Sequence, residues 1–229
     1  MDLPRGMKDF ENSEIQKIEY IREKFLSTSE IFGFELMEPS SIELMSVIEA
    51  KSGPAIRDDV YFFNDKGDRE VSLRFDFTVG LTRYVTGQKS MKLPAKISAF
   101  GGVWRYDEPQ KGRYRFFHQW DIEIFGKQNT ETDAEIIEFT SKFFSNLGLE
   151  NTILSISHRK IVQSYISSVF ESDKPELISD ILRAIDKIQK KSKQEIFSEY
   201  EKKGYAKENL EKIIEFSKLK GSPEEISKI

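Results

Sequence analysis

The sequence predicts an α+β fold in which helices flank an antiparallel β-sheet, followed by a separate helical region. Several segments of strand length alternate apolar and polar residues, whereas other segments repeat apolar residues every three or four positions. The two kinds of segment do not alternate as strand, helix, strand units, so a parallel sheet is not expected. Beyond residue 158 only the helical repeat continues.

The first part of the chain is expected to begin with a helix. This helix starts at Asn12 or Ser13 and ends at Gly33. Its apolar side carries Ile15, Ile18, Ile21, Phe25 and Ile31. The elements expected next are a short strand over residues 34–38, helical turns over 42–50, a hairpin formed by 59–63 and 70–76, and a short helix that begins near Asp76 or Thr78.

A longer hairpin dominates the centre of the sequence. The apolar run 95–104 and the alternating run 116–124 are joined by a polar loop that contains Pro109 and Gly112. Because side chains alternate along a strand, the second run has two different faces. The polar face comprises Phe117, Gln119, Asp121 and Glu123, and the apolar face comprises Phe116, His118, Trp120, Ile122 and Ile124. We expect the apolar face to be buried, with His118 as a buried structural residue.

Charged groups gather around this polar face. Arg105, Arg113 and Arg115 flank the loop, where the hairpin can fold them over the polar face. Cations beside carboxylates suit a substrate that carries both phosphates and an ammonium group. An ordinary amphipathic strand whose outer face meets water explains the same spacing, and the spacing alone does not separate the two interpretations.

The strand over residues 70–76 has a second polar face. Ser72, Arg74, Asp76 and then Thr78 fall on one side of it. We expect this strand to belong to the same sheet as the central hairpin. No role is assigned to Arg74.

The end of the first region and the region beyond it differ in character. Thr132 and Glu135 form a capping-box pair before a helix that ends at Gly148, and the β-rich run 151–157 is expected to be the last strand of the sheet. From Arg159 onward lysines are frequent and apolar residues recur at helical spacing. We therefore expect two regions, residues 1–158 and 159–229. The lysine run 187–193 is interpreted as a solvated helix end.

Composition excludes several classes of protein. The 229 residues include no Cys and two His, which argues against disulfides, thiolate catalysis and Cys- or His-rich metal sites. No apolar run approaches the ~20 residues that span a bilayer, so a cytoplasmic protein is expected. The net charge of −4 gives no general attraction to nucleic acid, so an RNA contact would have to be local.

The central hairpin resembles motif 2 of the class II aminoacyl-tRNA synthetases, which reads Arg-x-(Asp/Glu), a loop, and Arg-x-x-x-Phe-x-x-x-(Asp/Glu). Here the motif reads Arg105-Tyr-Asp107, a loop, and Arg113-Tyr-Arg-Phe-Phe117-His-Gln-Trp-Asp121. The text Pro-Gln-Lys-Gly-Arg-Tyr-Arg, followed by Phe-His-Gln and Glu-Ile-Phe-Gly, is similar to the histidyl-tRNA synthetases in particular. The expected fold is therefore the class II antiparallel sheet with its flanking helices and a helical insertion region.

Other stretches agree with the same family in order and spacing. Arg5-Gly-Met-Lys-Asp-Phe10 resembles the N-terminal signature of the family, and Leu73-Arg-Phe-Asp76-Phe-Thr78 resembles its amino-acid-binding strand. The first helix, ending in residues 34–39, with Glu43 beyond it, resembles motif 1, which forms the dimer interface in the family. The resemblance therefore implies a homodimer.

The resemblance also implies a role for each site residue. Arg105 would bind the α-phosphate of ATP and act in catalysis. The implied ATP-binding residues are Arg105, Asp107, Arg113 and Phe117, and the implied histidine-binding residues are Asp76, Thr78, Arg105, Gln119 and Glu123. The implied reaction joins L-histidine to ATP, usually with Mg²⁺ on the phosphates, and then transfers the histidyl group to tRNA(His).

The later family segments are not found in this sequence. These are a Tyr-Tyr segment, a Gly-rich strand, motif 3 and an anticodon-binding domain. The sequence thus resembles an N-terminal portion of the catalytic domain, and its pocket is expected to be incomplete. A paralogue that binds histidine without charging tRNA, such as a regulatory subunit of ATP phosphoribosyltransferase, is the main alternative. Retention of Arg105 and Arg113 favours the synthetase. An interaction module built on the lysine-rich helices is a third interpretation.

Overall fold

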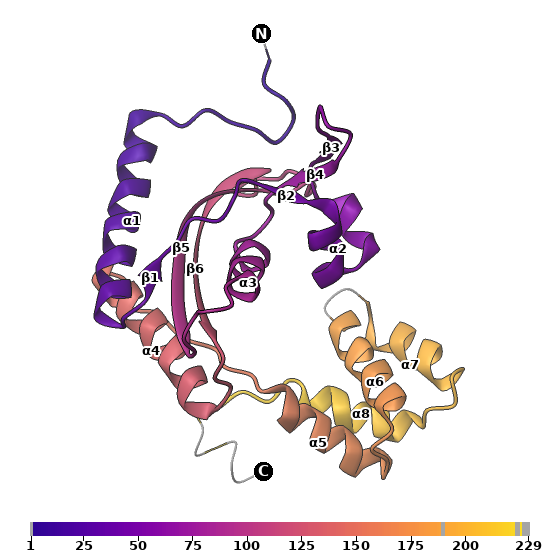
Figure 1. The fold of residues 1–229 in the computed structure, drawn as a ribbon. Helices are drawn as coiled ribbons and strands as arrows, with labels where there is room; N and C mark the ends of the chain where they lie inside the picture. The colour runs from indigo at the N-terminus through magenta and orange to yellow at the C-terminus, as the bar shows by residue number, and fades with distance from the viewer. Residues whose placement is uncertain (1, 189–190, 223–224, 226–229) are drawn as a thin grey trace. The chain divides into compact units, whose positions relative to one another are not determined.

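The computed structural model describes residues 2–188, 191–222 and 225, and it divides the chain into two compact units (Figure 1). The first unit is Met1–Leu154 and the second is Ser155–Ile229. Each unit has its own apolar core.

The first unit opens with helix α1 (Asn12–Ile31), whose capping box is formed by Glu11 and Glu14. The prediction that one apolar side of this helix is buried is confirmed in the middle of the helix and wrong at its two ends. Phe25 is fully buried, whereas Ile15 is 47% and Ile31 67% exposed. At 3.6 residues per turn, Ile15 and Ile31 lie roughly 80° and 120° around the helix from Phe25, so they cannot share its contacts.

The central sheet contains β1 (Glu35–Leu36), β5 (Ala95–Trp104) and β6 (Phe116–Phe125) in the order β1-β5-β6. Strands β5 and β6 form the predicted antiparallel hairpin, and β1 pairs with β5 in parallel. Helices α1 and α4 (Thr130–Asn146) pack on one face, and α3 (Thr78–Gly87) packs on the other (Figure 1). As predicted, the face that bears Trp120 and Ile122 joins the aromatic core beneath α1 and α4.

Strand β4 (Glu70–Leu73) belongs to a second sheet rather than to the central one, so the single sheet expected from the sequence is wrong. It lies between β2 (Ile42–Leu44) and β3 (Phe62–Asn64), and both neighbours pair with it in antiparallel. The helix expected over residues 42–50 begins later than predicted. Its first three residues form strand β2, and the helix itself is α2 (Met45–Ser52). A 3₁₀ helix, η1 (Pro54–Asp59), leads into the hairpin.

Arg74 joins the two sheets at the end of β4. Its Nε donates to the carbonyl of Gly102 in β5 at 2.8 Å, and its Nη1 donates to the carbonyl of Pro39 at 2.8 Å. Its Nη2 donates to the carboxylate of Glu38 at 3.0 Å. The Arg74 side chain is 5% exposed, so its bonds to the two carbonyls are shielded from water, whereas the Glu38 side chain is 65% exposed. They hold the end of β4 against β5.

Helix α3 packs closely on the chain between the sheets. A Cβ at Gly80 would lie 2.6 Å from Pro39 Cβ and 3.1 Å from Glu43 Oε1, so glycine permits this approach. Arg83 Nε and Nη2 donate to the buried Glu43 carboxylate at 2.7 and 2.8 Å. The backbone N–H of Val79 donates to Asp76 Oδ1 at 3.1 Å, which fixes the start of α3.

Two predictions at the end of the first unit are wrong. Helix α4 is capped by Asn129 with Thr132, because Glu135 instead pairs with Lys96 of β5. Residues 152–157, which the structure describes, form no strand, and Ile153 is 89% exposed. Strand propensity expresses packing against neighbouring strands, and this run has no ladder partner in the described structure.

The second unit is helical, as the sequence predicts for this region. Its helices are α5 (Arg159–Phe170), α6 (Pro175–Lys187), α7 (Lys193–Glu201) and α8 (Lys207–Phe216). Its core includes Ile166, Ile181 and Tyr200, all fully buried. In the lysine run, Lys187 and Lys191 pair with Glu199 at 2.5 and 2.9 Å, while Gln189 and Lys190 lie outside the described residues. Across the described chain, no helix combines the length and apolarity needed to cross a membrane.

The contacts of Arg74 lead to a prediction about stability. Arg74→Met should lower the free energy of unfolding of the first unit by about 3 kcal/mol, because buried carbonyls lose their donors. Urea unfolding followed by tryptophan fluorescence reports on this unit, since both tryptophans, Trp104 and Trp120, lie within it.

The matched control is Arg69→Met, which removes an arginine whose side chain is 70% exposed. This change should leave the unfolding midpoint nearly unchanged. Equal shifts for the two variants would contradict the role assigned to Arg74.

Candidate functional site

The candidate site lies where the polar face of β6 meets the end of β4 and the start of α3. Phe117, Gln119, Asp121 and Glu123 are half-buried on this face, and Phe117 packs on the core beneath α3. Across the ladder, Gly101 pairs with Gln119, and Ala99 pairs with Asp121. The space beside Gly101 is taken by Arg74 and Phe77, since a Cβ at this glycine would lie 3.1 Å from Arg74 Nη2 and 3.4 Å from Phe77 Cζ.

Three carboxylates converge in this site. Thr78 Oγ1 donates to Asp121 Oδ2 at 3.4 Å. Burial raises the pKa of Asp121 to about 6, and the negative charges of Glu123 and Asp76 add to the increase. Lys51 Nζ lies 3.4 Å from Asp76 Oδ2 and partly offsets the charge. The cluster therefore favours a ligand that brings positive charge.

Arg105 connects the end of β4 to this polar face. Its Nε donates to the carbonyl of Phe75 at 3.0 Å, and its Nη2 donates to Gln119 Oε1 at 3.1 Å. Its guanidinium carbon lies 5.2 Å from the centroid of the Phe117 ring, over its face. These bonds hold the guanidinium in place near the carboxylate cluster. A ligand that carries both a positive and a negative group could therefore place its negative group on Arg105.

Asp107 and Arg113 form a separate pair on the loop between β5 and β6. Arg113 Nε and Nη2 donate to Asp107 Oδ2 at 3.1 and 2.8 Å, and the Arg113 side chain is 54% exposed. The expectation that Arg115 lies over the polar face is wrong. Its guanidinium instead bonds to the carbonyls of Asp107 and Arg5, because its backbone is paired with the N-terminal segment.

The expected burial of His118 is also wrong. Its side chain lies on the predicted apolar face, where it contacts the rings of Phe10 and Phe116 at centroid distances of 5.7 and 5.6 Å. The residue is nevertheless exposed, because near the start of β6 it borders a hollow that Ile18 and Ile21 of α1 also line. Partial burial of the ring lowers its pKa.

Sequence reasoning missed two members of the site. Asp121 was placed on the polar face but given no ligand, although the alternation that selects Gln119 and Glu123 selects it equally. Lys51 lies in the last turn of α2, and no local pattern connects it with Asp76, which is 25 residues away.

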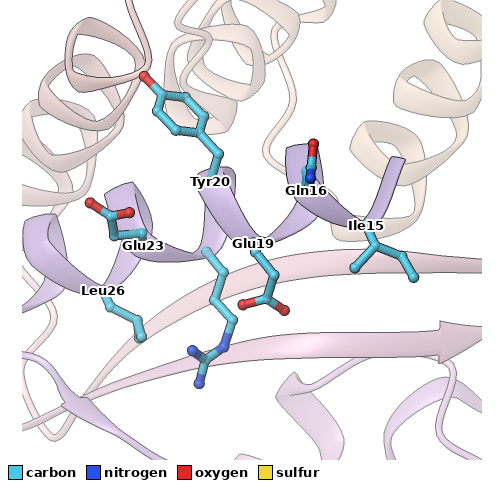
Figure 2. Close-up of a pocket in the computed structure, with 7 residues that line it drawn as sticks. Ile15, Gln16, Glu19, Tyr20, Glu23 and Leu26 are labelled. Carbon is cyan, nitrogen blue, oxygen red and sulfur yellow. The ribbon is translucent and has the colours of Figure 1, made fainter. Parts of the chain in front are cut away.

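A hollow lies outside this site, along α1 (Figure 2). Its lining residues are Ile15, Gln16, Glu19, Tyr20, Arg22, Glu23 and Leu26. Ile15 and Tyr20 are 47% and 46% exposed there. This surface belongs to the helix that precedes the motif 1-like segment.

The site can now be compared with known proteins. The family model described as histidyl-tRNA synthetase matches residues 6–229. The chain belongs to the histidyl-tRNA synthetase family. Histidine–tRNA ligases of Pyrobaculum islandicum and Sulfurisphaera tokodaii are 30% and 35% identical over 93% and 80% of this chain. Those matches cover 50% and 43% of the two relatives, so the chain spans about half the length of the family members it matches.

Solved structures show that the fold is also that of the family. Histidyl-tRNA synthetase from Nostoc sp. covers 98% of this chain with a TM-score of 0.80 at 24% identity, and 50% of that chain is matched. A Bacillus halodurans protein described as an ATP phosphoribosyltransferase regulatory subunit/histidyl-tRNA synthetase covers 93% with a TM-score of 0.77 at 17% identity, with 54% of that chain matched. The predicted class II fold is confirmed.

The pKa of Asp121 leads to a prediction about pH. Because this pKa is about 6 in the folded chain and about 4 in an unfolded one, the folded chain binds more protons between these values. The stabilisation linked to Asp121 is complete below about pH 4 and is lost as the pH rises through about 6. Asp121→Asn should therefore exceed the wild type in free energy of unfolding at pH 7, by up to about 3 kcal/mol.

This difference should close as the pH falls towards 4, measured by urea unfolding at a series of pH values. The exposed Asp58→Asn variant is the control and should follow the wild-type curve. If the free energies of unfolding of Asp121→Asn and the wild type differed by the same amount at every pH, then ionisation of Asp121 would not be disfavoured in the folded chain.

Proposed function

We propose that this chain contributes the N-terminal catalytic part, residues 1–158, of a histidine–tRNA ligase. In this reaction an oxygen of the histidine carboxylate bonds to the α-phosphorus of ATP, and the bond to the bridging oxygen breaks to release pyrophosphate. A terminal hydroxyl of tRNA(His) then bonds to the histidyl carbonyl carbon, and the bond from that carbon to the phosphate oxygen breaks to release AMP. The observation that carries the proposal is the convergence of the carboxylate cluster with Arg105.

Histidine is assigned to the carboxylate cluster. Asp76 and Glu123 pair with the α-ammonium group and with the imidazole N–H, since ionised carboxylates form the stronger hydrogen bonds. The hydroxyl of Thr78 and the amide of Gln119 form the remaining hydrogen bonds to histidine. Arg105, bonded to Gln119 at 3.1 Å, lies beside the position of the substrate carboxylate.

ATP is assigned to the arginine side of the site. Arg105 binds the α-phosphate and stabilises the charge that develops there, for which a fixed, planar guanidinium is suited. Arg113 and Asp107 on the loop lie near the terminal phosphates and the nucleotide, and Phe117 stacks on adenine. Neither chemical step needs a protein nucleophile, so positioning and charge neutralisation by these residues suffice.

Mg²⁺ is assigned to the phosphates of ATP rather than to a protein cage. Within the described residues, no three His, Asp or Glu side chains are grouped so that they could hold a metal ion. Mg²⁺ commonly reaches such sites bound to substrate phosphates, where it neutralises charge. The carboxylates of this chain then serve histidine.

The remaining assignments rest on the family. We propose a homodimer formed through α1 and the motif 1-like segment, with the exposed Ile15 and Tyr20 at the interface. Residues 159–229 are assigned to the helical insertion, and the protein is assigned to the cytoplasm.

The second candidate is a histidine-binding paralogue that does not charge tRNA. The likeness to the Bacillus halodurans protein, whose description includes a regulatory subunit, supports it. Such a protein needs the histidine residues but not the ATP arginines. Arg105 and Arg113 are both present, and Arg105 is bonded into the site, which favours the ligase.

Two measurements test the proposal. Calorimetry with L-histidine should show a Kd raised about tenfold or more by Asp76→Asn and by Glu123→Gln, because each removes a charge-assisted bond. Glu131→Gln, whose side chain is 79% exposed on α4, is the control and should bind as the wild type does. Histidine-dependent exchange of labelled pyrophosphate into ATP should be abolished by Arg105→Ala.

The outcomes separate the candidates. Exchange that depends on Arg105 supports the ligase. Histidine binding without exchange would mark this chain as an inactive piece of a ligase or as a binding paralogue. Binding that neither Asp76→Asn nor Glu123→Gln weakens would contradict the assigned histidine site.

A further inference from the structure

The N-terminal segment, residues 5–10, runs beside the loop that joins β5 to β6. The backbone N–H of Arg115 donates to the carbonyl of Gly6 at 2.8 Å. The side chain of Arg115 reaches back along the same segment, and its Nη1 donates to the carbonyl of Arg5 at 3.3 Å. These contacts join residues more than one hundred positions apart in the sequence, since Arg5 and Arg115 are separated by 110.

Gly6 is the point of closest approach. It has a φ of +82°, in the left-handed region that favours glycine. A Cβ at this position would lie 2.8 Å from Cγ and Cδ of Arg115 and 2.8 Å from Cγ of Pro109. Both neighbours belong to the loop or its end, so a side chain at residue 6 would push the N-terminal segment and the loop apart.

Arg115 connects Gly6 to two residues of the candidate site, Arg105 and Asp107. It is 9% exposed, its Nε donates to the carbonyl of Asp107 at 3.1 Å, and its guanidinium lies 3.8 Å from the centroid of the Tyr106 ring. Its own carbonyl accepts from the backbone N–H of Arg105 at 2.9 Å. Arg105 and Asp107 are therefore each one hydrogen bond away from the residue that Gly6 contacts.

Contacts on both sides of Gly6 extend the same arrangement. Arg5 forms an ion pair with Glu108 of the loop. Lys8 Nζ lies 4.8 Å from the centroid of the Tyr114 ring, and Phe10 packs edge-on against Phe116 at 5.9 Å. Most of the segment thus follows the loop from Glu108 to the first residue of β6.

We propose that residues 5–10 are a strap that orders the β5–β6 loop and, through Arg115, positions Arg105 and Asp107 for a nucleoside triphosphate. Residues 5–10 themselves contact the loop, and their effect on the ligand is indirect. The part of this proposal that concerns the loop is argued from the contacts alone. The part that concerns the ligand rests on the proposed function. A segment that only adds stability to the unit would not affect ATP and histidine differently.

Gly6→Ala and Gly148→Ala form a matched pair of variants. Gly148 has a φ of +81°, so alanine strains its backbone to the same extent as at Gly6. A Cβ at Gly148 meets no atom of the described residues within 4 Å. The pair therefore differs in the clash with Arg115 and Pro109.

Hydrogen exchange of the backbone amides measures the order of the loop. Gly6→Ala should speed exchange at the N–H groups of Arg105 and Arg115 by about tenfold or more, while the central β5–β6 ladder keeps its protection. Gly148→Ala should leave all of these amides as in the wild type. If the amides of Arg105 and Arg115 exchanged at the same rate in both variants, the proposal that residues 5–10 order the loop would be wrong.

Binding tests the consequence for the ligand. In Gly6→Ala the Kd for ATP should rise about tenfold, and the Kd for L-histidine should rise by a clearly smaller factor. Of the assigned histidine residues, Arg105 is bonded to Arg115, whereas Gln119 and Glu123 lie on the β5–β6 ladder and Thr78 lies on α3. Equal losses for both ligands would mean that the segment is merely structural. A wild-type chain that binds no ATP would contradict the proposed function, and the amide exchange would still decide the strap.

Arg115→Lys is the second variant if Gly6→Ala does not fold. It keeps the charge but loses the planar group that bonds to the carbonyls of both Arg5 and Asp107. Faster exchange at the Arg105 amide is expected again. Wild-type exchange in Arg115→Lys would show that Arg115 does not connect the strap to the site.

Discussion

The arrangement of the site depends on one buried guanidinium. Arg74 bonds to the carbonyls of Gly102 and Pro39 and to the carboxylate of Glu38, so one side chain holds three separate segments of the first unit together. A guanidinium can do this because its donors point in several fixed directions in one plane, whereas the ammonium group of lysine is a single point. With the end of β4 held against β5, Asp76 and Thr78 come next to the polar face of β6. The two sheets pair separately, yet they share one site.

That closeness has an electrostatic cost, which the structure shows at Asp121. Its pKa of about 6 arises from burial and from the negative charges of Glu123 and Asp76. Like charges and a low dielectric both disfavour ionisation, and Lys51 offsets the charge from one side at 3.4 Å from Asp76. A ligand with an ammonium group would relieve the repulsion on binding. The arrangement that raises the pKa of Asp121 therefore also favours a ligand that brings positive charge, and perturbed pKa values of this kind are common at functional sites.

The sequence predicts the local part of this arrangement well. Alternation along β6 separates the aromatic core side, with Trp120, from the polar side, with Gln119, because side-chain direction follows from strand geometry alone. It does not predict that β4 belongs to another sheet, since alternation says nothing about strand partners. Periodicity also fails at Ile15, which lies too far around α1 to share the contacts of Phe25. Contacts such as Arg74 with Pro39, 35 residues away, and Arg115 with Arg5, 110 residues away, leave no local pattern to read.

The two halves of the candidate site are held in different ways. Gln119 and Glu123 lie on a strand paired along its length with β5, so the backbone ladder fixes the side of the site that we propose for histidine. Asp107 and Arg113 lie beyond the ladder, and their ion pair is too exposed, with Arg113 at 54%, to determine the geometry of the loop. The loop geometry must therefore come from buried contacts, and Arg115 supplies them through the carbonyls of Asp107 and Arg5. Because the closest of these approaches tolerates no side chain at Gly6, the side of the site that we propose for the nucleotide depends on a residue near the start of the sequence. The N-terminal segment is for this reason part of the site's construction, although it contributes none of the groups assigned to either substrate.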